Sequence, residues 1–217
     1  RIIDEWTSVQ GRACADLFAG TDSATGQVQA WLQDCDLAIG WMDDLDGKLS
    51  ETFKAVGARE VIVRSPFSLT IDAIHQRDRF LAAINEAPSD GEGDALLAVT
   101  EPLLHLGQAS LEAAGLAIGQ PLVVIHPGSG STHKCVAPEI LASIVVALQI
   151  SGATPVILEG PADREPVERL LQSCVDPPIV LKGLDVHTVA GVLAQARLFV
   201  GQDSGVTHMA GLMGVRT

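Results

Sequence analysis

The sequence contains no tyrosine, and aromatic residues make up only 4% of its 217 residues. Hydrophobic residues nevertheless account for 47% and charged residues for 19%, so the chain can form a core and is not a disordered segment. That core must be built from Ala, Val, Leu and Ile, a composition that suits helices packed on a parallel β-sheet.

Basic residues are also scarce, because 14 Lys and Arg stand against 27 Asp and Glu and give a formal net charge of −13. Such a charge repels nucleic acid and anionic lipid at long range, and the sequence has no Lys/Arg cluster to offset it. We therefore expect no nucleic-acid partner. A local basic site for a phosphate ligand remains compatible with this charge.

Long hydrophobic runs and a signal-peptide pattern are absent, so the sequence predicts no membrane-spanning segment. The four cysteines are widely scattered and form no C-x-x-C pair, which argues against a zinc site and favours reduced, packed thiols in the cytosol. The sequence has no initiator Met and opens on an apparent strand, Ile2–Ile3. It stops where another strand appears to start, at 214–217, so we expect a fragment of a longer protein.

The N-terminal part alternates short apolar strands with amphipathic helices, the order typical of parallel βα units. Thr21 or Asp22 can cap a first helix, and a helix near 49–56 ends at Gly57. The strands are expected at 36–40 and 60–64, the latter closed by Pro66. Residues 66–119 read as mostly helical, with an exposed loop at 88–94 and an interruption at Pro102. We assign residues 1–118 to a partial N-terminal domain.

The same alternation restarts more clearly after residue 119. It predicts a doubly wound, Rossmann-like α/β domain of five strands separated by four helices over residues 119–217. The last strand and the tail of this domain are expected to lie beyond the sequence. The expected strands are 122–125, 155–158, 179–181 and 198–200, with a fifth starting at 214, and the expected helices are 138–150, 165–174, 186–196 and 206–213.

Three loops follow strands of this second domain, at the edge of the sheet where α/β proteins bind ligands. The first, 126–134, contains glycines and hydroxyls beside Lys134, which suit a close approach to an anion. The order of its residues matches neither a P-loop nor a dinucleotide-binding fingerprint. The second loop, 160–163, ends in Asp163, which can accept hydrogen bonds from a ribose or simply cap the next helix.

The third loop, 201–208, is the strongest candidate for a diphosphate site. A buried strand ends, turns within a few residues and starts a helix whose first N–H groups point at the crevice. His208 lies one turn into that helix and can reach a phosphate oxygen. Alone, His208 would more often be structural, but its place beside Asp203, Ser204 and Gly205 favours a binding role.

These loops, in this order, resemble glycosyltransferase family 9, the ADP-heptose:lipopolysaccharide heptosyltransferases. The resemblance rests on 126–131, Lys134, 160–163, Asp203-Ser204-Gly205 with His208, and 212–215. It implies a GT-B architecture, in which two Rossmann-like domains face a cleft and the N-terminal one is incomplete here. In that architecture the C-terminal domain binds the nucleotide-sugar donor and the N-terminal domain binds the acceptor.

The resemblance also implies roles for individual residues. Asp203 would orient the diphosphate and the sugar, and Asp163 replaces a Glu that would hold the ribose, while Leu184 matches a position near the base. One departure is Cys135-Val136-Ala137, where the family has a basic residue and Trp. The diphosphate would be held by Ser129, Gly130, Lys134, Ser204, Gly205 and His208.

The implied activity is inverting transfer of a heptose-like sugar from a nucleotide-diphosphate donor, ADP-heptose by resemblance, to a glycolipid or glycan acceptor. It uses neither metal nor cofactor, and it takes place in the cytoplasm or at the cytoplasmic face of the inner membrane. The family's catalytic base lies in an N-terminal glycine loop that this sequence lacks, so the fragment alone is expected to be inactive. The alternatives are a non-catalytic nucleotide-sugar binding module and another GT-B enzyme, such as a nucleotide-sugar epimerase.

Overall fold

The computed structural model of the chain describes residues 11–19, 26–66, 76–85, 97–116 and 119–217. The chain divides into two compact units, Arg1–Asp90 and Gly91–Thr217. Each unit contains one parallel sheet, which confirms the α/β class expected from the composition and from the alternation of strands and helices.

The first unit has a two-stranded parallel sheet of β1 (Leu37–Trp41) and β2 (Glu60–Arg64), with Leu37 opposite Glu60. Helix α3 (Lys48–Val56) connects the strands, and Gly57 ends it with a φ of 127°, the conformation that a helix-ending glycine supplies. These elements confirm the predicted strands and helix. The unit also contains α1 (Arg12–Ala19), α2 (Gly26–Leu32) and α4 (Gln76–Ala83).

Three predictions for the first unit fall outside the described residues. They are the strand at Ile2–Ile3, the helix cap at Thr21 or Asp22, and the loop at 88–94. The expected apolar helix that follows the cap is present as α2, which ends at Leu32.

The second unit is built on a four-stranded parallel sheet of β3 (Leu122–His126), β4 (Thr154–Glu159), β5 (Ile179–Lys182) and β6 (Leu198–Gly201). The strand order is β5-β4-β3-β6. The chain therefore moves outward from β3 through β4 to β5, and then returns to the other side of β3 as β6. The reversal creates a switch point between the carboxyl ends of β3 and β6, where sheets of this kind bind ligands.

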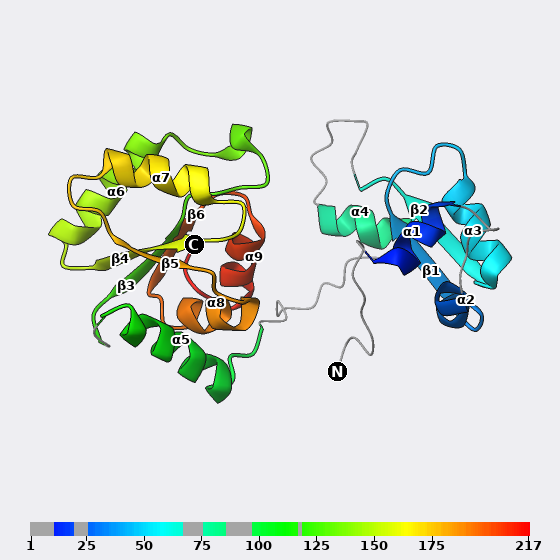
Figure 1. The fold of residues 1–217 in the computed structure, drawn as a ribbon, viewed down its shortest axis with the longest axis horizontal. Helices are drawn as coiled ribbons and strands as arrows, with labels where there is room; N and C mark the ends of the chain where they lie inside the picture. Colours follow the sequence, from blue (N-terminus) through cyan, green and yellow to red (C-terminus); the bar gives the residue numbers. More distant parts are fainter. Residues whose placement is uncertain (1–10, 20–25, 67–75, 86–96, 117–118) are drawn as a thin grey trace. The chain divides into compact units, whose positions relative to one another are not determined.

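Helices cover both faces of this sheet (Figure 1). On one face, α6 (Pro138–Ile150) and α7 (Arg164–Ser173) pack against Val123, Ile125 and Ile157. On the other face, α5 (Glu101–Ala113), α8 (Val186–Leu193) and α9 (Gly205–Leu212) enclose a second core that contains Val124 and Phe199. Strand β3 is buried along its whole length because both faces are covered, as its continuous apolar run predicts.

The structure corrects the predicted number of strands. Residues 119–217 contain four strands where five were expected, because the residues after Gly214 are not assigned to a strand. Arg216 nevertheless lies along β6, where its carbonyl oxygen accepts a hydrogen bond of 2.8 Å from the Phe199 N–H.

Helix α5 departs from its expected position in two ways. It belongs to the second unit, whereas the sequence pattern predicts a first domain that ends at residue 118. Pro102 does not interrupt the helix but lies in its first turn, where its missing N–H costs no hydrogen bond. The physical reason for its place in the second unit is close packing on α8.

The contact of α5 with α8 depends on two glycines. A Cβ at Gly191 would lie 2.0 Å from the carbonyl oxygen of Leu103, and a Cβ at Gly107 would lie 2.0 Å from the backbone carbon of Gly191. No side chain fits between backbones this close. The two glycines therefore allow α5 to approach α8 this closely.

None of the helices in the described ranges is long and apolar enough to cross a membrane. The four cysteines, Cys14, Cys35, Cys135 and Cys174, are free thiols, as their scattered positions predict.

Substituting either glycine should separate the two helices. We expect Gly191→Ala and Gly107→Ala to destabilise the protein by about 1–3 kcal/mol each, the usual cost of overfilling a packed contact. Urea unfolding followed by circular dichroism measures the change. Gly211→Ala on α9 is the matched control, since a Cβ there meets no atom within 4 Å. If Gly191→Ala were as stable as wild type, the two helices would be able to move apart without cost, which would contradict the prediction.

Candidate functional site at the carboxyl ends of β3 and β6

Two of the three predicted ligand loops meet at the switch point. His126, the last residue of β3, is aligned with Gly201, the last residue of β6, so the loops that follow begin at the same level of the sheet. The Ser129 hydroxyl of the first loop donates a hydrogen bond of 2.8 Å to the Asp203 carbonyl oxygen of the second. This hydrogen bond connects the glycine-serine loop after β3 to the segment that begins α9.

The first turn of α9 opens this site toward an anion. Ser204 is the N-cap, and its hydroxyl oxygen accepts a hydrogen bond of 3.4 Å from the Thr207 N–H. The first N–H groups of a helix have no partner within the helix and carry a partial positive charge. The space beside Gly205 is open, because a Cβ there would meet no atom within 4 Å. An anion can therefore approach the backbone at this point.

Two basic side chains contact the Asp203 carboxylate. The Lys134 ammonium lies 2.5 Å from one Asp203 carboxylate oxygen, and the His208 ring lies 3.5 Å from the other. Lys134 comes from a short 3₁₀ helix, η2 (Thr132–Lys134), in the loop after β3. The hydrogen bond from Lys134 lowers the pKa of Asp203, with further contributions from its charge and from His208. All three side chains are more than half exposed, so they can exchange partners when a ligand arrives.

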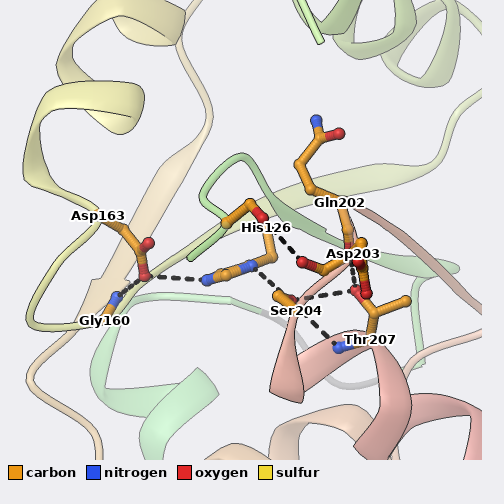
Figure 2. A network of polar contacts seen from close by, with 8 residues as sticks. His126, Gly160, Asp163, Gln202, Asp203, Ser204 and Thr207 are labelled. Carbon is orange, nitrogen blue, oxygen red and sulfur yellow. Dashed lines mark hydrogen bonds and ion pairs between the residues drawn. The ribbon is translucent and has the colours of Figure 1, made fainter. Parts of the chain in front are cut away.

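A buried network lies behind this surface (Figure 2). The His126 ring reaches Asp163 with one nitrogen, at 2.9 Å, and Ser204 with the other, at 3.3 Å. The same Asp163 oxygen accepts a hydrogen bond of 2.9 Å from the Gly160 N–H. On the far side, the Thr207 hydroxyl interacts with Ser204 at 3.1 Å and donates to the Gln202 carbonyl oxygen. The network joins the loops after β3, β4 and β6.

Asp163 lines the cavity described below, but it is largely buried and takes part in this network. It is only 9% exposed. It occupies the N-cap position of α7, yet its side chain makes no capping hydrogen bond and turns instead toward Gly160 and His126. Gly128 leaves room for it, because a Cβ there would lie 1.8 Å from an Asp163 carboxylate oxygen. The glycine of the His-Pro-Gly segment is thus explained by a close approach to a carboxylate.

A cavity of about 460 Å³ adjoins the α9 N-terminus. Six of the nine predicted site residues line it, namely Ser129, Gly130, Asp163, Leu184, Ser204 and Gly205. Of the other three, Lys134 and His208 each contact Asp203, and Ser129 links Asp203 to the cavity. The structure therefore brings all nine together, while their role in nucleotide binding stays a prediction. The apolar part of the wall consists of Leu158, Leu181, Leu184, Val189, Val206 and Met209.

A second cavity, of about 410 Å³, lies near the starts of α6 and α7. It shares Ser129 with the first, but Arg169, the cation on its wall, is already paired with Glu165 at 2.5 Å. The 460 Å³ cavity is the one that adjoins the switch point and the open start of α9, and Ser129 links its wall to Asp203, which Lys134 and His208 contact.

His126 is the functional candidate that the sequence analysis left out of the predicted site. It is 4% exposed and follows four apolar strand residues. A polar residue at the end of a buried strand is a usable signal, since such a group must find a hydrogen-bond partner. Its partner, Asp163, lies 37 residues further along the chain, so the sequence alone does not identify it.

Removing the His126 ring should destabilise the fold, because the buried Asp163 carboxylate then keeps only its hydrogen bond from the Gly160 N–H. We expect His126→Ala to lower the free energy of unfolding by about 1–3 kcal/mol or more. The double variant His126→Ala/Asp163→Ala should lose less than the sum of the single losses. Urea titration measures all three, with the exposed His105→Ala on α5 as the control. Additive losses would mean that the two side chains do not interact.

The pKa of Asp203 provides a direct check on the surface cluster. Carbon-13 NMR of the carboxyl groups should give Asp203 a pKa below the ordinary value for aspartate, because Lys134 stabilises the ionised form. Lys134→Ala should raise that pKa toward the ordinary value. Arg197→Ala, which removes an exposed positive charge just before β6, should leave it unchanged. An Asp203 pKa that does not respond to Lys134→Ala would contradict the ion pair.

Comparisons with known proteins agree with this geometry. The model of glycosyltransferase family 9 (heptosyltransferase) matches residues 76–217, which is more than half of the chain. A search of curated protein sequences gave no match.

Solved structures of glycosyltransferases have the same fold at low sequence identity. A family 9 glycosyl transferase from Veillonella parvula is 20% identical, with a TM-score of 0.71 over 95% of this chain and 62% of that one. E. coli ADP-heptose lps heptosyltransferase II is 15% identical, with a TM-score of 0.66 over 93% of this chain and 71% of that one.

E. coli heptosyltransferase WaaC with ADP is 15% identical, with a TM-score of 0.52 over 87% of this chain and 63% of that one. The chain thus spans roughly two thirds of the length of these proteins. Its parallel sheets match their GT-B-like fold, and with the family match the chain belongs to glycosyltransferase family 9.

Proposed function

We propose that the second unit binds the nucleotide diphosphate of a sugar donor and that the protein transfers the sugar to an acceptor hydroxyl. The main observation in support is that an open helix start, Lys134 and His208 lie together at the switch point, beside a cavity with an apolar wall. A nucleotide diphosphate has the matching parts, an anionic group joined to a flat, largely apolar base.

The diphosphate belongs at the start of α9 in this proposal. Backbone N–H groups at Gly205 and the next residue would donate to its oxygens, and each such charge-assisted bond contributes about 1.5–3 kcal/mol. Lys134 and His208 would leave Asp203 and pair with the phosphates, which carry more negative charge than one carboxylate. The released Asp203 carboxylate would then be available to the hydroxyls of the donor sugar.

The base would occupy the apolar end of the cavity. Leu181, Leu184 and Val189 form its wall there, at the end of β5 and the start of α8. Adenine is the base we propose, because the WaaC structure was determined with ADP and the other E. coli relative is an ADP-heptose heptosyltransferase. A heptose-like sugar follows from the same comparison.

The chemical step is displacement at the anomeric carbon of the donor sugar. The acceptor oxygen forms a bond to that carbon as the bond to the diphosphate oxygen breaks, and inversion follows from attack on the opposite face. Negative charge grows on the leaving diphosphate, where Lys134, His208 and the helix start stabilise it. These fixed charges support a metal-independent reaction without a cofactor. A general base on the acceptor-binding half would take the hydroxyl proton.

The acceptor is proposed to be a glycolipid or another glycan, and the protein to act in the cytoplasm or at the cytoplasmic face of the inner membrane. The relative described as acting on lps supports a glycolipid acceptor. With a formal net charge of −13, the chain would meet an anionic acceptor only through a local basic surface.

Calorimetric titration of the chain with ADP, UDP and GDP tests the donor site. We expect ADP to bind most tightly and Lys134→Ala and His208→Ala each to weaken it by about tenfold, the loss of one charged hydrogen bond. Arg197→Ala and His105→Ala are the matched controls, since they remove an exposed cation and an exposed ring elsewhere in the second unit. Absence of nucleotide binding, or equal losses in the controls, would contradict the donor site.

A further inference from the structure

The loop after β4 offers two carboxylates to the donor cavity, and the structure gives them different surroundings. Glu159 is the last residue of β4, and Asp163 lies four positions later at the start of α7. Both line the cavity of about 460 Å³. The family resemblance gives the ribose-binding role to Asp163.

Asp163 has little capacity left for a ligand. One carboxylate oxygen already accepts hydrogen bonds from His126 and from the Gly160 N–H, each at 2.9 Å. The other faces Gly128 so closely that a Cβ there would lie 1.8 Å away. A ribose hydroxyl at the first oxygen would compete with the His126 ring and the Gly160 N–H, and the second oxygen lies close against the Gly128 backbone.

Glu159 is better placed to accept hydrogen bonds. It is half-buried at the carboxyl end of the strand next to β3, and among the described residues none donates a hydrogen bond to its carboxylate or forms an ion pair with it. Two cations lie near Glu159. Arg164 is paired with Glu168 at 2.8 Å. Lys182 is opposite Glu159 in the β4–β5 register. An acidic residue near the end of the second strand of a Rossmann-like unit is the group that binds ribose hydroxyls in such domains. In this unit the second strand is β4.

Building on the proposed donor site, we propose that Glu159 is the carboxylate that accepts the ribose hydroxyls, whereas Asp163 is a positioning residue. Asp163 acts through His126, which it holds against Ser204 at the diphosphate end of the site. The two neighbouring vicinal hydroxyls of a ribose match the two oxygens of one carboxylate. The site therefore selects ribonucleotides over nucleotides that lack these hydroxyls.

The test compares ADP with 2′,3′-dideoxy-ADP by calorimetric titration of the whole chain. Wild type should bind ADP about ten- to a hundredfold more tightly, as expected for hydrogen bonds to a charged group. Glu159→Ala should weaken the binding of ADP but not of the dideoxy nucleotide, so that the ratio of the two affinities falls to within about twofold of one. Asp163→Asn should keep the ratio, because any loss affects both nucleotides.

Glu112→Ala on α5 is the matched control, since it removes an exposed carboxylate that contacts only Gln108 among the described residues, at 3.1 Å. It should change neither affinity, and thermal melts should show that Glu159→Ala remains folded. The inference would be overturned if Glu159→Ala kept the wild-type preference for ADP over the dideoxy nucleotide, or if Asp163→Asn lost that preference instead. If wild type binds both nucleotides equally, the donor site stands and this inference falls; if wild type binds neither, both fall.

Discussion

His126 lies at the carboxyl end of β3, the strand at the switch point of the second sheet, and its two ring nitrogens reach the loops after the two neighbouring strands. Parallel strands deliver their loops to the same edge of a sheet, but they do not fix where each loop goes next. The imidazole supplies that constraint, because it is buried and both of its nitrogens need partners. The positions of Asp163 and Ser204, and hence the start of α9, depend on this ring.

The charges of the site are arranged in two layers with different properties. The inner pair, His126 with Asp163, is almost fully enclosed, so its hydrogen bond is little screened by solvent. The outer cluster of Lys134, His208 and Asp203 is exposed and screened. The inner layer therefore suits a fixed shape, and the outer layer suits partners that exchange during binding and release.

Much of the fold follows from local patterns in the sequence. The apolar run of β3, the proline at the start of α6 and the glycine after α3 are each read correctly because their effect is set by neighbouring residues. The end of the chain is only partly predicted: Arg216 makes one backbone hydrogen bond to β6, but 214–217 does not form a strand, because strand formation depends on pairing with the sheet edge and not on the segment alone. The place of α5 is likewise decided by Gly191, far away in the sequence.

The same division applies to the candidate site: features set by neighbouring residues are predictable, and those set by distant residues are not. Glycines, hydroxyls and Lys134 indicate a candidate anion site, because these residues lie close together in one segment of the sequence. The orientation of the Asp163 side chain cannot be predicted from neighbouring residues. From the sequence alone, Asp163 could equally be a helix cap or a ligand-binding carboxylate. Only the partner across the sheet, His126, turns that side chain inward and leaves Glu159 as the carboxylate open to the cavity.

The Asp203 carboxylate also determines which anions the site can discriminate. With Lys134 and His208 already facing a negative group, an incoming phosphate gains only the difference between two similar attractions. If the site binds a nucleotide as proposed, inorganic phosphate would gain only this difference. A ligand that also filled the apolar wall and reached the β4 carboxylate would gain energy that a free ion lacks. Under the proposal, the internal counter-anion would thus favour the larger molecule over the free ion.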